Sequence, residues 1–340
     1  MQIFHILTFQ PTRLVSVMTM SFSSSRSAFA RTPSTRWGIP HTLFMLLTAI
    51  FLIASVDTIR AEAAQPLVSA KWLSENLDAS SIRILDLQSP QGYARAHIKG
   101  AVNTSYAQWR QTDANGLPKM LPDLDYLQSL IGTLGIEQGT HVILAPIGIS
   151  ASEVAVATRV YWTFKTLGHD KVSILNGGLI AYSKLSDAKF VTEPTTVSPT
   201  TYNASLNKDM APNGDEVNFA WKQGVVMVDS RSEDEYLGKV AGPGQRAGTI
   251  PDSRFMPFDR LLEKDGQSFR FPEVSELKSI YEKHKVPTSG RQISFCHTGH
   301  RTSLTWFVSH ELLGNKDAKL YDASMAEWAK RQDLPIAKPK

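Results

Sequence analysis

The sequence predicts an α/β protein built from two tandem copies of one domain. Short apolar segments of strand length alternate with segments of helical periodicity, which is typical of a mostly parallel sheet flanked by helices. The same order of segments occurs twice in the 340-residue chain, at an offset of about 150 residues. We expect domains at residues 64–190 and 215–335, joined by a linker at 191–214 that is rich in Thr, Pro and Ser.

The repeat is visible in matched pairs of segments. Asp86 and Asp229 each end an apolar run, and each is followed seven residues later by a tyrosine. Residues 121–124 match 271–274 and residues 142–144 match 292–294 at an offset of 150, whereas 167–168 match 313–314 at 146. The change of offset predicts that the loop after the 142–144 strand is four residues longer than its counterpart.

The second copy illustrates the predicted elements in chain order. The expected elements are a buried strand at 224–229, a helix from Pro272 to about His284, a strand at 293–295, a helix at 302–313 that Gly314 ends, and a last strand at 320–321. This alternation predicts that the segment after the 293–295 strand lies at the carboxyl edge of a parallel sheet, where ligands bind in such folds.

The first 63 residues have the pattern of a secretory signal peptide with a preceding basic region. An apolar run of 14 residues, Leu43–Val56, is shorter than the roughly 20 needed to span a membrane. Arg26, Arg31 and Arg36 precede it, and Ala61-Glu62-Ala63 follows as a small-residue cleavage site. We therefore expect an exported protein with no stable membrane anchor after cleavage; the alternative is an uncleaved N-terminal anchor.

Charge and cysteine content exclude several classes of protein. The formal net charge is +4, but residues 1–63 contribute five arginines, one aspartate and one glutamate, which leaves +1. A nearly neutral chain gives no electrostatic reason to expect a nucleic-acid partner. A single cysteine, Cys296, excludes a disulfide within the chain and any metal site made of several cysteines.

Cys296 begins a short polar loop between a predicted strand and a predicted helix. The loop reads Cys296-His297-Thr298-Gly299-His300-Arg301. Gly299 permits unusual backbone angles, so the loop can turn its N–H groups inward, next to the positive end of the following helix. Such surroundings stabilise a thiolate, and the two histidines and the arginine add polar or cationic character. The pattern predicts a nucleophilic thiolate that faces an anionic substrate.

Other interpretations of this loop remain open. Cys296 could be a buried structural residue, and His297 with His300 could bind a metal, although no third ligand is evident nearby. A cysteine phosphatase has Cys and Arg in the spacing C-x5-R, whereas Cys296 and Arg301 are spaced C-x4-R. A thiol–disulfide oxidoreductase would need a second cysteine.

Taken together, these segments resemble the rhodanese (sulfurtransferase) family in its tandem two-domain form. The loop Cys296–Arg301 is similar to the family's active-site loop, and His97–Asn103 resembles the segment usually written GHIxGAxN, with Arg246–Pro251 as its second copy. The resemblance covers about residues 66–335 and implies two rhodanese-like domains. It implies a catalytically inactive first domain, because Pro146 or Ser150 stands where the second copy has the cysteine.

The resemblance also implies a reaction and roles for residues. Cys296 would take the sulfane sulfur of thiosulfate as a persulfide and pass it to a thiophilic acceptor such as cyanide, without cofactor or metal. The expected substrate-binding residues are His297, Thr298, Gly299, His300, Arg301 and Arg246, and the expected supporting residues are Thr302, Asp229 and Arg231. Glu235 stands where some of these enzymes place a substrate-binding arginine, so the donor stays open. The alternative is a non-catalytic module that carries sulfur, and the expected location is the bacterial periplasm.

Overall fold

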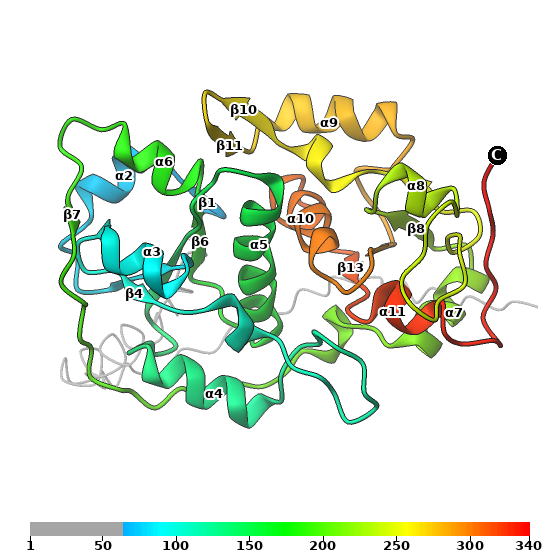
Figure 1. The fold of residues 1–340 in the computed structure, drawn as a ribbon, viewed down its shortest axis with the longest axis horizontal. Coiled ribbons are helices and arrows are strands. Elements are labelled where there is room, and N and C mark those ends of the chain that lie inside the picture. Colours follow the sequence, from blue (N-terminus) through cyan, green and yellow to red (C-terminus); the bar gives the residue numbers. More distant parts are fainter. Residues whose placement is uncertain (1–63) are drawn as a thin grey trace, which may run out of the picture. The chain divides into compact units, whose positions relative to one another are not determined.

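The computed structural model describes residues 64–340 (Figure 1). The predicted signal peptide therefore lies outside the described residues. Among the helices that the structure describes, none combines the length and the apolar character required to cross a membrane.

Each half of the described chain contains a parallel sheet, which confirms the predicted fold class. The first sheet has the strand order β1 (Leu67–Val68), β6 (Val172–Leu175), β5 (His141–Ala145), β2 (Ile82–Asp86), β4 (Val102–Asn103). The second has the order β13 (Ala318–Leu320), β12 (Gln292–Phe295), β8 (Val226–Asp229), β9 (Arg254–Phe255). Two antiparallel pairs lie outside these sheets: β3 (His97–Ile98) with β7 (Phe190–Val191), and β10 (Glu263–Asp265) with β11 (Ser268–Arg270).

Helices connect the strands of both sheets (Figure 1). In the first half they are α2 (Ala70–Glu75), α3 (Pro90–Arg95), the 3-10 helix η1 (Tyr106–Trp109), α4 (Leu124–Thr133), α5 (Ala151–Thr166) and α6 (Gly178–Ser183). In the second half they are η2 (Lys208–Met210), α7 (Gly214–Lys222), α8 (Glu233–Tyr236), η3 (Phe258–Leu261), α9 (Val274–Lys283), α10 (Arg301–Phe307), the π-helical η4 (Val308–Leu312) and α11 (Ser324–Trp328).

The predicted four-residue insertion lies in a helix and not in the loop. The loop after β5 begins at Pro146 and ends at Ser150, and the loop after β12 begins at Cys296 and ends at His300, so the two have equal length. The following helix differs instead: α5 has 16 residues, whereas α10 has 7 and η4 has 5. Pro146 is therefore the structural counterpart of Cys296.

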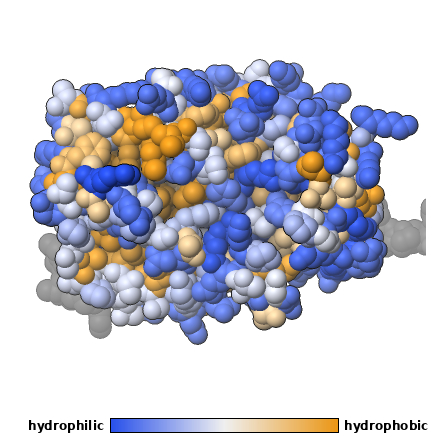
Figure 2. All heavy atoms as spheres, viewed as in Figure 1, coloured by the Kyte–Doolittle hydropathy of each residue, from blue (hydrophilic) through white to orange (hydrophobic). Residues whose placement is uncertain are grey.

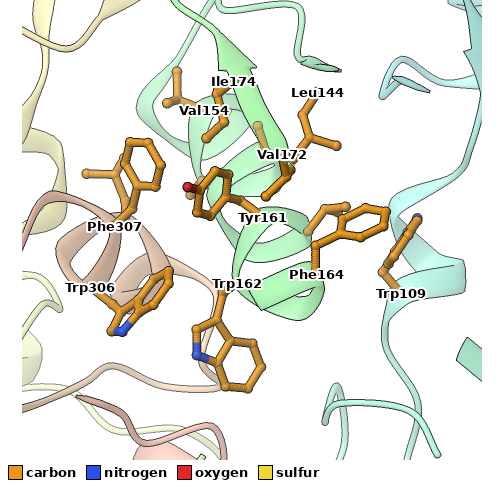
Figure 3. Packing of buried hydrophobic residues seen from close by; sticks show 14 of the residues in the cluster. Trp109, Leu144, Val154, Tyr161, Trp162, Phe164, Val172, Ile174, Trp306 and Phe307 are labelled. Carbon is orange, nitrogen blue, oxygen red and sulfur yellow. The ribbon is translucent and has the colours of Figure 1, made fainter. Parts of the chain in front are cut away.

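The two domains share one apolar core where α5 packs against α10. Figure 3 shows Tyr161 of α5 beside Trp306 and Phe307 of α10. The rings of Tyr161 and Phe307 meet edge to face with their centroids 4.8 Å apart. Removing this apolar surface from water is favourable, so the contact holds the first domain against the helix that follows the cysteine loop.

The predicted linker is packed and not free. It begins in β7, and the Thr200 N–H donates to the Gly132 carbonyl of α4 at 2.9 Å. Tyr202 is only 3% exposed, and its hydroxyl contacts His169 at 3.2 Å. The linker therefore packs against the first domain before α7 begins the second domain.

Apolar residues are unevenly distributed over the face of the molecule that Figure 2 draws. Figure 2 shows apolar residues gathered mainly on the left half of the face, over the first domain, with hydrophilic residues prevailing on the right. The large apolar side chains that residues 64–340 expose are Tyr126, Ile149, Phe219, Val240 and Val274. Scattered exposed apolar residues of this kind are normal and do not by themselves mark a binding site.

Candidate active site

The structure places Cys296 directly after β12, in a loop that α11 holds. The side chain of Cys296 is 1% exposed. The N–H groups of Met325 and Ala326 donate to the carbonyls of Cys296 and His297, at 3.1 and 2.9 Å. The Cys296 N–H in turn donates to Ser324 Oγ at 3.1 Å. These bonds fix the start of the loop and leave the backbone beyond it to face the cavity.

The rest of the loop offers hydrogen-bond donors without acceptors. Within residues 64–340, the N–H groups of His297, Thr298, Gly299 and His300 donate to no protein acceptor. Gly299 has a φ of +73°, the left-handed conformation that glycine adopts without strain. Free backbone N–H groups in a short loop at a helix N-terminus can receive an anion, so these groups are suited to an anion beside the cysteine.

The supporting residues Asp229 and Arg231 pair with each other. Arg231 Nη2 lies 2.7 Å from Asp229 Oδ2 and 2.8 Å from the Gly248 carbonyl. The Thr249 hydroxyl donates to the same carboxylate at 2.7 Å. Thr302 is fully buried, with its hydroxyl 3.4 Å from that of Ser230. This network joins the ends of β8 and α10 to the turn at 248–249, and it serves structure rather than substrate contact.

Arg301 lines the cavity, but its guanidinium already forms an ion pair with the carboxylate of Glu235. Glu235 accepts two hydrogen bonds from Arg301, at 2.6 and 2.8 Å. Burial by itself would raise the pKa of Glu235, but the bonds from Arg301 and Ser232 outweigh it and lower the pKa to about 2. Glu235 therefore neutralises the arginine that we expected to meet the donor.

The ion pair makes a pH-dependent contribution to stability. The folded pKa of Glu235 lies below its ordinary value of 4.5, so its stabilisation is complete above that value and is lost as the pH falls towards 2. We expect Glu235→Gln to cost about 1–2 kcal/mol at pH 7, with the difference from the unmutated protein shrinking between pH 5 and pH 3. Urea unfolding at several pH values measures it. Glu233→Gln on the same helix is the control, because Glu233 is exposed. A pH-independent difference would contradict the prediction.

The structure corrects the role predicted for Arg246. Its guanidinium donates to the carbonyls of Trp328, Ala329, Arg331 and Leu334. Arg246 is not among the residues that line the cavity beside Cys296. Carbonyl oxygens of the C-terminal segment satisfy it, so it anchors that segment and does not face the donor.

Of the polar or cationic character expected of the loop histidines, the lowered pKa values of both favour the polar, uncharged form. His300 Nδ1 lies 2.7 Å from the Tyr106 hydroxyl, and Nε2 lies 3.1 Å from Ser152 Oγ. Burial, followed by the nearby cations, lowers the pKa of His300 to about 3. Burial also lowers the pKa of His297. Within residues 64–340 no group of three or more His, Cys, Asp or Glu could hold a metal ion.

A cavity of about 610 Å³ opens over the cysteine, and both domains line it. The second domain contributes Phe258, Cys296, His297, Thr298, His300 and Arg301. The first contributes Tyr106, Ala107, Arg110, Lys119, Ser152 and Val156. The sequence predicts none of these six residues of the first domain, because neither η1 with the turn after it nor the start of α5 carries a motif.

Comparisons with known proteins match both domains of the chain. The family model for a rhodanese-like domain matches residues 69–185 and again 217–331. The chain is 31% identical over 279 residues to "Putative thiosulfate sulfurtransferase 1" of Mycobacterium bovis, covering 79% of this chain and 96% of that one. It is 33% identical over 282 residues to "Thiosulfate sulfurtransferase" of Mus musculus, covering 78% and 92%.

Solved structures also share this fold. The Escherichia coli protein SseA, described under 3-mercaptopyruvate sulfotransferases, matches with a TM-score of 0.66 and 26% identity over 76% of this chain and 98% of that one. The anaerobic ergothioneine biosynthesis enzyme of Chlorobium limicola matches with a TM-score of 0.69 over 81% and 70%, but at 19% identity this likeness concerns the fold alone.

A tandem pair of parallel-sheet domains with one cysteine loop is the architecture of a two-domain sulfurtransferase, and this chain belongs to the rhodanese family. Within that family its relatives include proteins named thiosulfate sulfurtransferase.

Proposed function

We propose that this protein transfers a sulfane sulfur from thiosulfate, or a similar anionic donor, to a thiophilic acceptor through a persulfide on Cys296. One observation carries the proposal: the chain's single cysteine lines the cavity, in a loop whose next four N–H groups have no acceptor within residues 64–340. The relatives named thiosulfate sulfurtransferase support thiosulfate as the donor. SseA supports 3-mercaptopyruvate as the donor to compare with it.

The proposed reaction has two steps. In the first, the Cys296 thiolate attacks the outer sulfur of thiosulfate; the new S–S bond forms, the S–S bond of thiosulfate breaks, and sulfite leaves with the electron pair. In the second, cyanide attacks the terminal sulfur of the persulfide, thiocyanate leaves, and the thiolate is restored. Negative charge is present throughout, so fixed N–H donors around the sulfur stabilise both transition states without reorganising.

We expect the protein to gain one sulfur atom when it is incubated with thiosulfate and to lose it on addition of cyanide. Intact-mass spectrometry measures the gain, and Cys296→Ser should show none. Thiocyanate should then accumulate far beyond one equivalent per protein. A single equivalent, without further turnover, would favour the carrier alternative. No gain with a thiol shown to be free would contradict thiosulfate as the donor, and the same assay with 3-mercaptopyruvate would follow.

A further inference from the structure

Of the two arginines that the sequence assigned to the donor, one is paired with a carboxylate and the other does not line the cavity, whereas two cations of the first domain do line it. Arg301 is paired with Glu235, and Arg246 is bound to carbonyls elsewhere. Arg110 and Lys119 line the cavity from the segment that follows η1. The domain without a cysteine thus supplies the positive charge that the cysteine loop lacks.

Arg110 has only neutral partners. Its Nη1 donates to the Tyr106 hydroxyl at 3.0 Å and its Nε to the Lys119 carbonyl at 2.7 Å. Its Nη2 donates to the carbonyls of Lys119 and Thr298. Among residues 64–340 no carboxylate forms an ion pair with it. Burial, followed by the nearby Arg159, lowers its pKa, and the attraction of Asp322 offsets this only in part. A half-buried cation without a counter-ion is stabilised by an anion that enters the cavity.

Lys119 presents an ammonium group over the same space. Its side chain is exposed at the rim of the cavity and forms no hydrogen bond or ion pair within residues 64–340. It is one of the cations that lower the pKa values of His297 and His300, after burial. Its charge therefore reaches the cysteine loop.

The backbone of Lys119 is held in a strained conformation. Its φ is +63°, which costs a residue with a side chain about 1–2 kcal/mol. The neighbouring residues enforce it: Met120 exchanges two backbone hydrogen bonds with Gln111, and the Leu121 N–H donates to Asp322 Oδ2 at 2.8 Å. A strained backbone of this kind persists only where the surrounding structure holds the residue in place, and such residues cluster at functional sites. Both domains therefore fix the position from which this ammonium group extends.

We propose that Lys119 and Arg110 bind the anionic, oxygen-bearing end of the sulfur donor. Both cations line the cavity that Cys296 lines, and Arg110 contacts the cysteine loop at the Thr298 carbonyl. They would hold the oxyanion end of the donor, leave its sulfane sulfur to Cys296 and stabilise the charge on the departing sulfite. This inference rests on the proposed function. It makes the first domain the part of the protein that selects donors by charge.

Lys119 is the better residue to test, because Arg110 also holds the Thr298 carbonyl and its replacement would disturb the loop. We expect Lys119→Glu to raise the KM for thiosulfate about tenfold, with a smaller change in kcat, because an attraction to a dianion becomes a repulsion. Lys119→Gln should give an intermediate KM. The control is Lys278→Glu, the same charge change at an exposed position on α9 that does not line the cavity.

A binding measurement separates this inference from the proposed function. Calorimetric titration of thiosulfate into Cys296→Ser needs no sulfur transfer, and we expect Lys119→Glu in that background to weaken binding about tenfold while Lys278→Glu does not. If the protein never forms a persulfide, the proposed function fails, but weaker binding by Lys119→Glu still supports the anion site. Equal binding and equal KM values for the Lys119 and Lys278 variants, both folded by their thermal unfolding, would overturn it.

Discussion

Replacing Asp322 by asparagine is expected to destabilise the protein by about 3–5 kcal/mol, because it leaves a buried arginine of the other domain without its counter-ion. Arg159 of α5 lies 2.6 Å from Asp322, and their side chains are 0% and 7% exposed. The contact is an ion pair rather than a well-aligned hydrogen bond, and Arg159 Nε and Nη2 have no hydrogen-bond partner within residues 64–340. The carboxylate is therefore the main compensation for a fully buried charge.

A double-mutant cycle measures this interaction. Asp322→Asn, Arg159→Met and the double variant are unfolded in urea, followed by tryptophan fluorescence. We expect the double variant to cost clearly less than the sum of the two single ones, because it leaves no buried charge unpaired. Asp322→Asn should also increase the rate at which iodoacetamide modifies Cys296, since Arg159 Nη1 donates to the Gly299 carbonyl at 3.3 Å.

The chain offers an exposed ion pair between the same two domains as a control. Lys184 lies 3.3 Å from Asp265, with side chains 48% and 51% exposed. Solvent screens such a pair, so Asp265→Asn should cost less than about 1 kcal/mol. Equal costs for Asp265→Asn and Asp322→Asn would contradict the prediction that burial determines the strength of the pair between the domains.

The fold could be predicted because its signals are local. Short apolar segments and amphipathic helices depend on neighbouring residues, and the repeat doubled each signal. The misplaced insertion has a physical cause. Of the 16 residues of α5, 12 are buried, so the helix has no polar face to mark where it begins. Only its end, at residues 167–168, has a clear counterpart in the sequence of the second copy.

The active site could be predicted only on the side that the motif spans. Cys296 and its loop are contiguous, whereas Tyr106 meets His300 across 194 residues, in a contact that no periodicity records. For the same reason the sequence shows a charge but not its partner. Arg246 and Arg301 have the residue type that binds an oxyanion, and only the fold shows that carbonyls bind one and Glu235 the other.

Gly299→Ala is expected to have the second large effect, because the loop has no room for a methyl group. A Cβ atom at Gly299 would lie 2.4 Å from Arg159 Nη1 and 2.5 Å from Asp322 Oδ1. The φ of +73° adds about 1–2 kcal/mol of strain. Displacing the buried ion pair as well should bring the total cost to about 3 kcal/mol or more.

Gly314→Ala separates the two causes. Gly314 has a φ of +75°, and a Cβ there would meet no atom within 4 Å, so this variant incurs only the backbone strain. The difference between the two variants in urea unfolding is therefore the cost of pushing Arg159 from Asp322. Because Gly299 lies in the cysteine loop, its variant should also load sulfur from thiosulfate more slowly, whereas Gly314→Ala should load at the rate of the unmutated protein. Equal unfolding free energies and equal loading rates would mean that the loop and the ion pair can move apart without cost. The first domain would then contact the cysteine loop without holding it in place.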